Sequence, residues 1–103
     1  SFEQNVNADK IQYKVPNEEE KNIFLDLINR IELLPDNVDA ETIQTEIYQI
    51  GKDHNFDNLR EWFKLIYQVL FGKSDGPRFG TFIAIYGIKE TTQLIRERIK
   101  VSK

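Results

Sequence analysis

Residues 59–72, with the sequence LREWFKLIYQVLFG, carry the strongest pattern in the chain. Apolar side chains recur there at intervals of three and four residues, at Leu59, Trp62, Phe63, Ile66, Tyr67 and Leu70. This spacing predicts an amphipathic helix with one buried face. Asp57 is expected to cap its start, and Gly72 suits a left-handed stop at its end.

Upstream of this segment, the pattern predicts a helix that begins at Asn17. Glu20 lies three residues after this N-cap in a capping-box arrangement, and Glu18 and Glu19 complement the positive end of the helix dipole. Pro35 is expected to stop this helix. Its apolar stripe consists of Phe24, Leu27, Ile28, Ile31 and Leu34.

A further helix is predicted between these two, with Asp39 as its cap and Ile43, Ile47 and Ile50 on its buried face. Asn55 suits a left-handed turn at its end. Residues 1–16 have low hydrophobicity and end in a Val-Pro pair, so we expect an N-terminal arm or linker before a helical domain over residues 17–103.

Downstream, residues 79–86 are aromatic and apolar, a pattern that fits either a buried strand or a short core helix. Helix is favoured because the chain offers no second strand to pair with it. A last helix is predicted over residues 89–100, burying Ile88, Ile95 and Ile99 and directing Arg96, Arg98 and Lys100 outward. The connections are short, so we predict an all-α fold, a compact bundle of about five helices.

Composition excludes several classes of function. The chain has no cysteine and one histidine, so a disulfide framework, a thiol nucleophile and a zinc cluster are not expected. Glu18 to Glu20 and His54 are better explained by the helix dipole and by packing than by catalysis, so no catalytic or metal site is predicted. With no long apolar run and no signal-peptide pattern, we expect a cytoplasmic protein without a membrane partner.

Charge is distributed unevenly along the chain. Residues 1–57 carry 5 Lys/Arg against 13 Asp/Glu, a net charge of −8, whereas residues 58–103 carry 9 against 4, a net charge of +5. The second part can face a polyanion such as RNA. The negative charge of residues 1–57 is at least as pronounced as the positive charge of residues 58–103. It supports an alternative function, a protein–protein interaction module that docks a basic partner.

Three glycines and a proline surround two cations in residues 72–80, GKSDGPRFG. The spacing is wrong for a phosphate-binding P-loop, and no strand precedes it. The backbone N–H groups of this turn and Arg78 are able to hold a phosphate or the edge of an unpaired base. Chemistry alone favours an ordinary helix connector, in which glycine supplies positive dihedral angles.

Several segments together resemble the C-terminal part of class I lysyl-tRNA synthetases. They are residues 47–50 (IYQI), residues 60–67 (REWFKLIY) and the loop 72–80, in that order. Tyr13 and Pro16 before the acidic helix start, Phe82 after the loop, and Gly87 before the last helix also match. The resemblance covers residues 13–99, with departures at Gly51, where alanine is expected, and at Asn55, where glycine is expected.

This resemblance implies an anticodon-binding helical cage similar to that of glutamyl-tRNA synthetases. Neither catalytic motif of such enzymes is present, so ATP-dependent lysylation, with its ATP and Mg²⁺, would belong to a separate catalytic domain of the same polypeptide. No cofactor is expected in residues 17–103. The implied partner is the anticodon loop of tRNA(Lys), whose unstacked bases can be read on their edges and stacked on aromatic or arginine planes.

The resemblance also turns the loop 72–80 from a connector into a candidate RNA-binding site. Arg78 is expected to contact a base edge or a phosphate, and Gly76 and Pro77 to form the backbone surface nearest the RNA. The expected phosphate partners are Lys73, Arg60 and Lys64. Tyr67, Trp62 and Phe79 are possible stacking platforms, although aromatic residues at helical spacing belong more often to the core.

Overall fold

A computed structural model describes residues 11–101, and within them the chain forms five helices and no strand. The helices are α2 (Glu18–Glu32), α3 (Ala40–Asp53), α4 (Leu59–Phe71), α5 (Phe79–Tyr86) and α6 (Ile88–Ile99). The predicted all-α bundle is confirmed, and residues 79–86 are helical.

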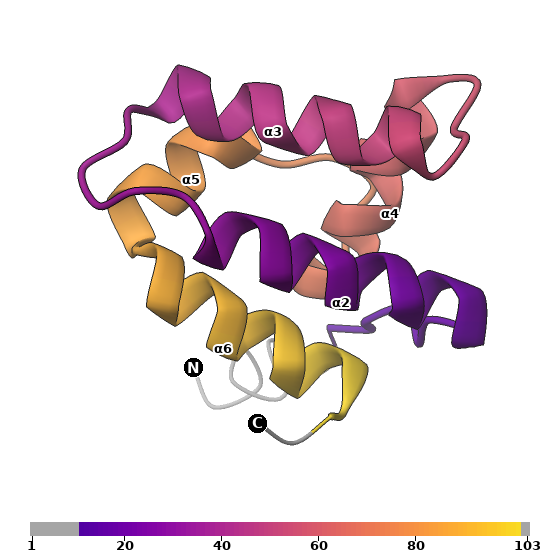
Figure 1. The fold of residues 1–103 in the computed structure, drawn as a ribbon. Coiled ribbons are helices and arrows are strands. Elements are labelled where there is room, and N and C mark those ends of the chain that lie inside the picture. The colour runs from indigo at the N-terminus through magenta and orange to yellow at the C-terminus, as the bar shows by residue number, and fades with distance from the viewer. Residues whose placement is uncertain (1–10, 102–103) are drawn as a thin grey trace, which may run out of the picture.

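Three of the helices run side by side, with α2 between α3 and α6 (Figure 1). The short helix α5 packs against α3 and α6 at the left of Figure 1, and α4 contacts the same two helices from the right. Each helix therefore contacts at least two others, which is how every amphipathic stripe finds a partner for its apolar face.

The core is built around the indole of Trp62, which is fully buried. Its Nε1 donates a hydrogen bond to the carbonyl oxygen of Ile47 at 2.9 Å, and the ring of Phe24 lies 5.8 Å away, centroid to centroid. Gly51 lies against the same indole, because a Cβ added there would fall 2.5 Å from Trp62 Cδ1. The departure from alanine at this position therefore has a steric reason in this chain.

Most of the predicted helix ends are confirmed. Asn17 Oδ1 accepts from the Glu20 backbone N–H at 2.8 Å, while the Glu20 carboxylate accepts from the Asn17 N–H at 3.0 Å, which completes the capping box. Asp39 caps α3 by accepting from the Thr42 N–H at 2.8 Å. Gly72 ends α4 in the left-handed conformation, with a φ of 71°.

Three of the expected boundaries differ from the structure by one or two residues. Helix α2 ends at Glu32, so Leu34 lies in the following turn, where it still packs against the core. Asn58 caps α4 in place of Asp57, because its side chain accepts from the Arg60 N–H at 2.9 Å. Helix α6 begins one residue early, at Ile88, immediately after Gly87.

Residues 11–16 lie along the C-terminal half of α4. The Lys14 N–H donates to the Gln68 carbonyl oxygen at 3.0 Å, and Arg98 Cζ lies 4.1 Å from the centre of the Tyr13 ring. Arg98 also donates to the Leu70 carbonyl oxygen at 3.1 Å, so the expectation that it points outward is wrong. Residues 1–10 lie outside the described part of the chain, and the predicted boundary at residue 16 stays a prediction.

The same correction applies to Arg96, which is ion-paired with Glu32 of α2 at 3.1 Å and is only partly exposed. Both arginines therefore join α6 to neighbouring helices, and the basic surface of the chain must be sought on other residues.

Candidate nucleic-acid interface

The loop 72–80 connects α4 to α5, and Tyr67 anchors it from beneath. The Tyr67 hydroxyl donates to the Pro77 carbonyl oxygen at 2.6 Å. A Cβ added to Gly76 would lie 2.9 Å from Tyr67 Cδ1, so a glycine at this position lets the loop lie flat on the ring. Burial raises the pKa of the Tyr67 phenol, and Asp75 raises it further. The loop is therefore held in one conformation, with Gly76 and Pro77 exposed on its outer side.

The end of the loop is fixed by contacts between α5 and α3. The Gly80 N–H donates to Gln44 Oε1 at 2.6 Å, and a Cβ at Gly80 would lie 2.5 Å from the Ala40 carbonyl oxygen. Phe79, next to it, is fully buried. The Gly80 N–H is thus already occupied, and the idea that the backbone donors of this turn hold a phosphate is wrong for this residue.

Arg78 is the N-cap residue of α5 and its guanidinium faces α3. Its Nη2 lies 3.0 Å from each carboxylate oxygen of Glu41, in an ion pair whose side chains are 47% and 74% exposed. An ion pair as exposed as this contributes only about 0–1 kcal/mol, because water screens both charges. Arg78 is therefore positioned by Glu41, and a phosphate or base edge is able to replace the carboxylate at small cost.

The other predicted cations lie along α4 and at the start of the loop. Arg60 and Lys64 are exposed and one helical turn apart, and Lys73 is exposed just after the helix. Two adjoining depressions share Lys14 and Gln68; one of them is also lined by Lys73, and the other by Lys64 together with the carboxylates of Glu20 and Glu61. The structure therefore brings Lys64 and Lys73 onto one side of α4, while Arg78 lies beside α3.

Lys14 also lies beside these cations of α4, and sequence reasoning did not identify it. It lies in the segment expected to be an arm, and its backbone bond to Gln68 is what carries it to α4. Its ammonium is also 3.7 Å from the Glu20 carboxylate, so part of its charge is shared within the chain. A basic residue four positions before the helix start is a weak signal, because nothing local indicates which helix the segment follows.

The rings named as stacking candidates belong to the core. Trp62 and Phe79 are fully buried, and Tyr67 is buried under the loop. The expectation that aromatic residues at helical spacing are core residues is confirmed for all three. The tyrosines that reach the surface in residues 11–101 are Tyr13, Tyr48 and Tyr86.

The acidic and histidine side chains have structural partners. Arg30 is ion-paired with Glu46 and Asp53 at 2.8 Å each, joining α2 to α3, and His54 Nε2 lies 2.7 Å from Asp26 Oδ2. His54, the C-cap residue of α3, therefore makes a polar contact with α2, where packing and a contact with the helix dipole were expected. Within residues 11–101, no group of three or more His, Cys, Asp or Glu side chains is arranged to hold a metal ion.

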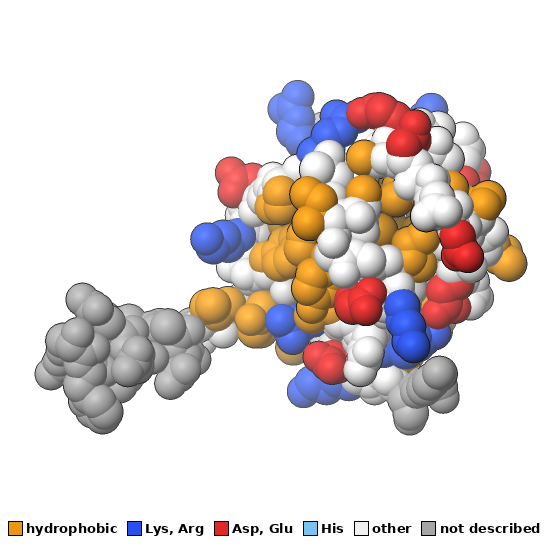
Figure 2. Space-filling view, turned by 90° about the vertical axis from the view of Figure 1, so that its left-hand side faces the viewer, with side chains coloured by type: hydrophobic (Ala, Val, Ile, Leu, Met, Phe, Trp, Pro, Cys, Tyr) orange, Lys and Arg blue, Asp and Glu red, His pale blue; other side chains and the backbone are white. Residues whose placement is uncertain are grey.

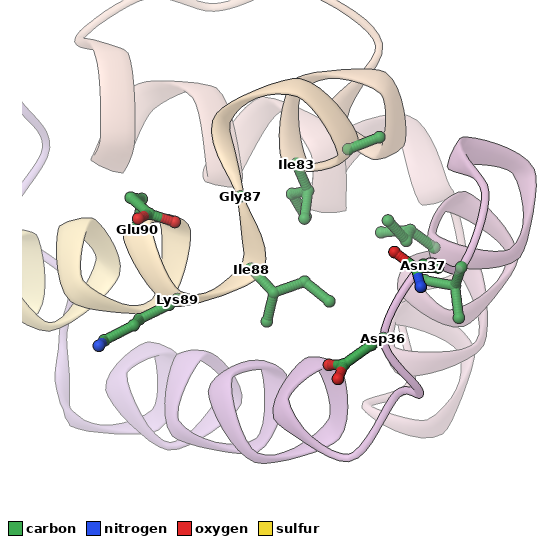
Figure 3. Close-up of a pocket in the computed structure, with 10 residues that line it drawn as sticks. Asp36, Asn37, Ile83, Gly87, Ile88, Lys89 and Glu90 are labelled. Atoms are coloured by element: carbon green, nitrogen blue, oxygen red, sulfur yellow. The ribbon is translucent and has the colours of Figure 1, made fainter.

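Another depression lies where the α5–α6 junction meets the loop between α2 and α3 (Figure 3). Asp36, Lys89 and Glu90 surround an apolar floor that includes Ile83 and Ile88, and none of the site residues predicted from the sequence lines it. Figure 2 shows the face at the left of Figure 1, with apolar side chains at its centre and charges of both signs around them. This face lacks the concentration of cations that nucleic acid requires.

Several known proteins that are similar to this chain are lysine–tRNA ligases. It is 48% identical over 87 residues to a lysine–tRNA ligase of Rickettsia bellii and 45% identical over 87 residues to one of Rickettsia felis, and each of these alignments covers 84% of this chain. A lysine–tRNA ligase of Rickettsia conorii is 40% identical over 94 residues, or 91% of this chain.

The chain spans only 17% to 18% of the length of these relatives. No protein-family model matches it, and no solved structure matches it significantly. In the described residues, no helix combines the length and the apolarity needed to cross a bilayer. The chain is therefore homologous to one short segment of lysine–tRNA ligases.

Proposed function

We propose that this chain is the anticodon-binding, C-terminal domain of a class I lysyl-tRNA synthetase. The observation that supports this most is the similarity over 84% of the chain to lysine–tRNA ligases of which it spans 17%. In this proposal a separate catalytic domain of the same polypeptide binds ATP and Mg²⁺ and carries out the ATP-dependent lysylation of tRNA. The present chain contributes binding and needs no cofactor.

The loop 72–80 suits an unpaired RNA segment because its outer surface is exposed and its conformation is fixed. Tyr67 holds Pro77 from below, and the absence of a Cβ at Gly76 lets the loop rest directly on the Tyr67 ring. The planar guanidinium of Arg78 is able to bond a base edge or a phosphate with two parallel N–H groups. Recognition in this proposal exchanges the Glu41 carboxylate for an RNA acceptor.

The cations along α4 supply the part of binding that does not depend on base identity. In the proposal Arg60, Lys64, Lys73 and Lys14 contact phosphates on either side of the anticodon. Such contacts weaken as the salt concentration rises, because binding releases the counterions of the RNA. Affinity for RNA should therefore fall steeply with salt even though the chain as a whole is acidic.

The acidic part of the chain offers less free charge than its composition suggests. Asp26, Glu46 and Asp53 face Arg30 or His54, while Glu32 pairs with Arg96. These carboxylates join helices to one another, which leaves a smaller acidic surface for a basic protein partner. This smaller acidic surface weakens the case for the alternative of a protein–protein interaction module.

Substitution of Arg78 by alanine in the full-length ligase tests the proposal. The KM for tRNA(Lys) should rise by a factor that corresponds to about 1–3 kcal/mol, or about 5- to 150-fold, while lysine activation measured by pyrophosphate exchange stays intact. Arg96→Ala is the matched control, because Arg96 pairs with Glu32 away from the loop. An unchanged tRNA dependence in the Arg78 variant would remove Arg78 from the site.

A direct measurement uses the 103-residue chain itself. It is titrated at low salt with a labelled RNA hairpin that carries the lysine anticodon, and with a hairpin of the same stem and an unrelated loop. The lysine hairpin should bind more tightly. Equal binding of both hairpins would contradict anticodon recognition.

A further inference from the structure

Six aromatic side chains of α3, α4 and α5 form a continuous row that passes beneath the loop. Successive ring centroids are 5.3, 6.5, 6.2, 5.1 and 5.0 Å apart along Tyr48, Phe63, Tyr67, Phe71, Phe82 and Tyr86. The four inner rings are buried or partly buried. The two end tyrosines reach the surface, with 37% of Tyr48 and 48% of Tyr86 exposed.

The two ends of the row differ in the charge around them. Tyr86 lines a depression together with Glu90 and Glu97, two carboxylates that repel phosphate. Tyr48 lies on α3 with the exposed Lys52 one turn after it, because residues four apart on a helix are neighbours. Its ring partner Phe63 lies one turn after the exposed Arg60. The Tyr48 end therefore combines a ring with cations.

Tyr48 lies on the helix whose Glu41 is paired with Arg78. Glu41, the ion-pair partner of Arg78, precedes Tyr48 by seven residues, which is two helical turns and about 10 Å along the same face of α3. On its other side, Tyr48 is joined to Tyr67, which holds Pro77, through the ring of Phe63, whose centroid lies 5.3 Å from that of Tyr48 and 6.5 Å from that of Tyr67. The exposed part of Tyr48 thus lies on the same stretch of surface as Arg78, the residue proposed to contact a base edge or a phosphate.

We propose that the Tyr48 ring is a stacking platform for an unpaired base of the bound RNA. The edge-to-face contact with Phe63, at 5.3 Å and 72°, fixes the ring before the RNA arrives and costs no ordering on binding. An exposed aromatic ring beside cations has the chemistry that single-stranded RNA requires, since bases stack on the ring while phosphates approach the cations. This inference rests on the proposed function.

The test compares two exposed tyrosines of the same row in the 103-residue chain. Tyr48→Ala should weaken binding of the lysine anticodon hairpin by about 5- to 150-fold, the loss expected for one base stacked on one ring. Tyr48→Phe keeps the ring and should bind like the unsubstituted chain. Tyr86→Ala is the matched control and should also bind normally. Thermal unfolding of each variant shows whether it is folded, and Tyr48→Leu replaces Tyr48→Ala if the alanine variant is not.

A spectroscopic signature separates stacking from a merely structural role. A fluorescent adenine analogue placed in the hairpin loop should be quenched by the unsubstituted chain and by Tyr48→Phe, but not by Tyr48→Ala at saturating concentration. Because the hairpin is fully bound by every variant at this concentration, differences in affinity do not affect the comparison. A difference in quenching therefore reports whether the ring at position 48 stacks on the adenine analogue.

The outcomes of these experiments distinguish failure of the proposed role of Tyr48 from failure of the proposed anticodon-binding function. If the unsubstituted chain binds the lysine hairpin no better than an unrelated hairpin, the proposed function fails and the role of Tyr48 fails with it. If binding is selective and folded Tyr48→Ala binds equally tightly, only the role of Tyr48 is overturned. Equal losses in Tyr48→Ala and Tyr86→Ala would also overturn it, because the acidic end should not bind RNA.

Discussion

Replacing Gly80 by alanine tests whether this glycine of the loop serves packing or RNA binding. A Cβ at this position would lie 2.5 Å from the Ala40 carbonyl oxygen and 2.8 Å from both Cβ and the backbone nitrogen of Gln44. These atoms belong to α3 itself and to the first carbon of a side chain, so no rotamer change removes the overlap. The helices α3 and α5 must move apart.

The expected loss of stability follows from two opposing effects. Overpacking of this kind costs about 1–3 kcal/mol, and separation of the helices also weakens the hydrogen bond from the Gly80 N–H to Gln44, worth about 0.5–1.5 kcal/mol. Alanine regains up to about 1 kcal/mol of helix propensity. We therefore expect a net loss of about 2 kcal/mol, which lowers the Tm of a domain of this size by about 8–16 °C.

Thermal unfolding followed by circular dichroism measures this change, with Thr81→Ala, an exposed neighbour in the same helix, as the control. A Gly80→Ala variant with the same Tm as the unsubstituted chain would refute the packing argument. If that variant kept its stability and lost affinity for the lysine hairpin, Gly80 would instead belong to the RNA surface.

Two further perturbations probe the loop anchor and the network between α2 and α3. Tyr67→Phe removes the hydrogen bond to Pro77 and should lower the free energy of unfolding by about 0.5–1.5 kcal/mol in urea titrations; equal stability would show that the bond does not anchor the loop. Hydrogen bonds from Gln49 and Arg30 lower the pKa of Asp53, so its charge stabilises the fold above its unfolded pKa of about 3.9 and this contribution is lost as the pH falls through the folded pKa. Asp53→Asn should therefore melt below the unsubstituted chain at pH 7, and the difference should vanish in acid; a difference that is independent of pH would contradict the assignment.

The sequence alone predicted the helices well because their determinants are local. Apolar spacing, the capping box of Asn17 and Glu20, and the glycine stop at Gly72 each involve residues a few positions apart. Local reasoning was less exact where two equivalent caps are adjacent. Asp57 and Asn58 are both good N-caps, and in the structure it is the Asn58 side chain that accepts from the Arg60 N–H.

The candidate site was identified by a short motif, but its working geometry depends on distant residues. Arg78 meets Glu41 across 37 positions, and Gly80 meets Gln44 across 36. Nothing near the loop in the sequence indicates either contact. The packing of α5 on α3 therefore decides that Gly80 supports the fold while Arg78 remains exposed for binding.

The aromatic residues show the same division between local pattern and tertiary structure. Helical spacing groups Trp62, Phe63 and Tyr67 on one side of α4, but it does not tell how far each ring lies from the surface. That depth depends on where α3 and the loop cover α4, which buries Trp62 and Tyr67 and leaves Tyr48 of α3 at the edge. The sequence by itself determined the helices and the motif; only the packing of helices against one another decided which rings and cations of that motif face solvent.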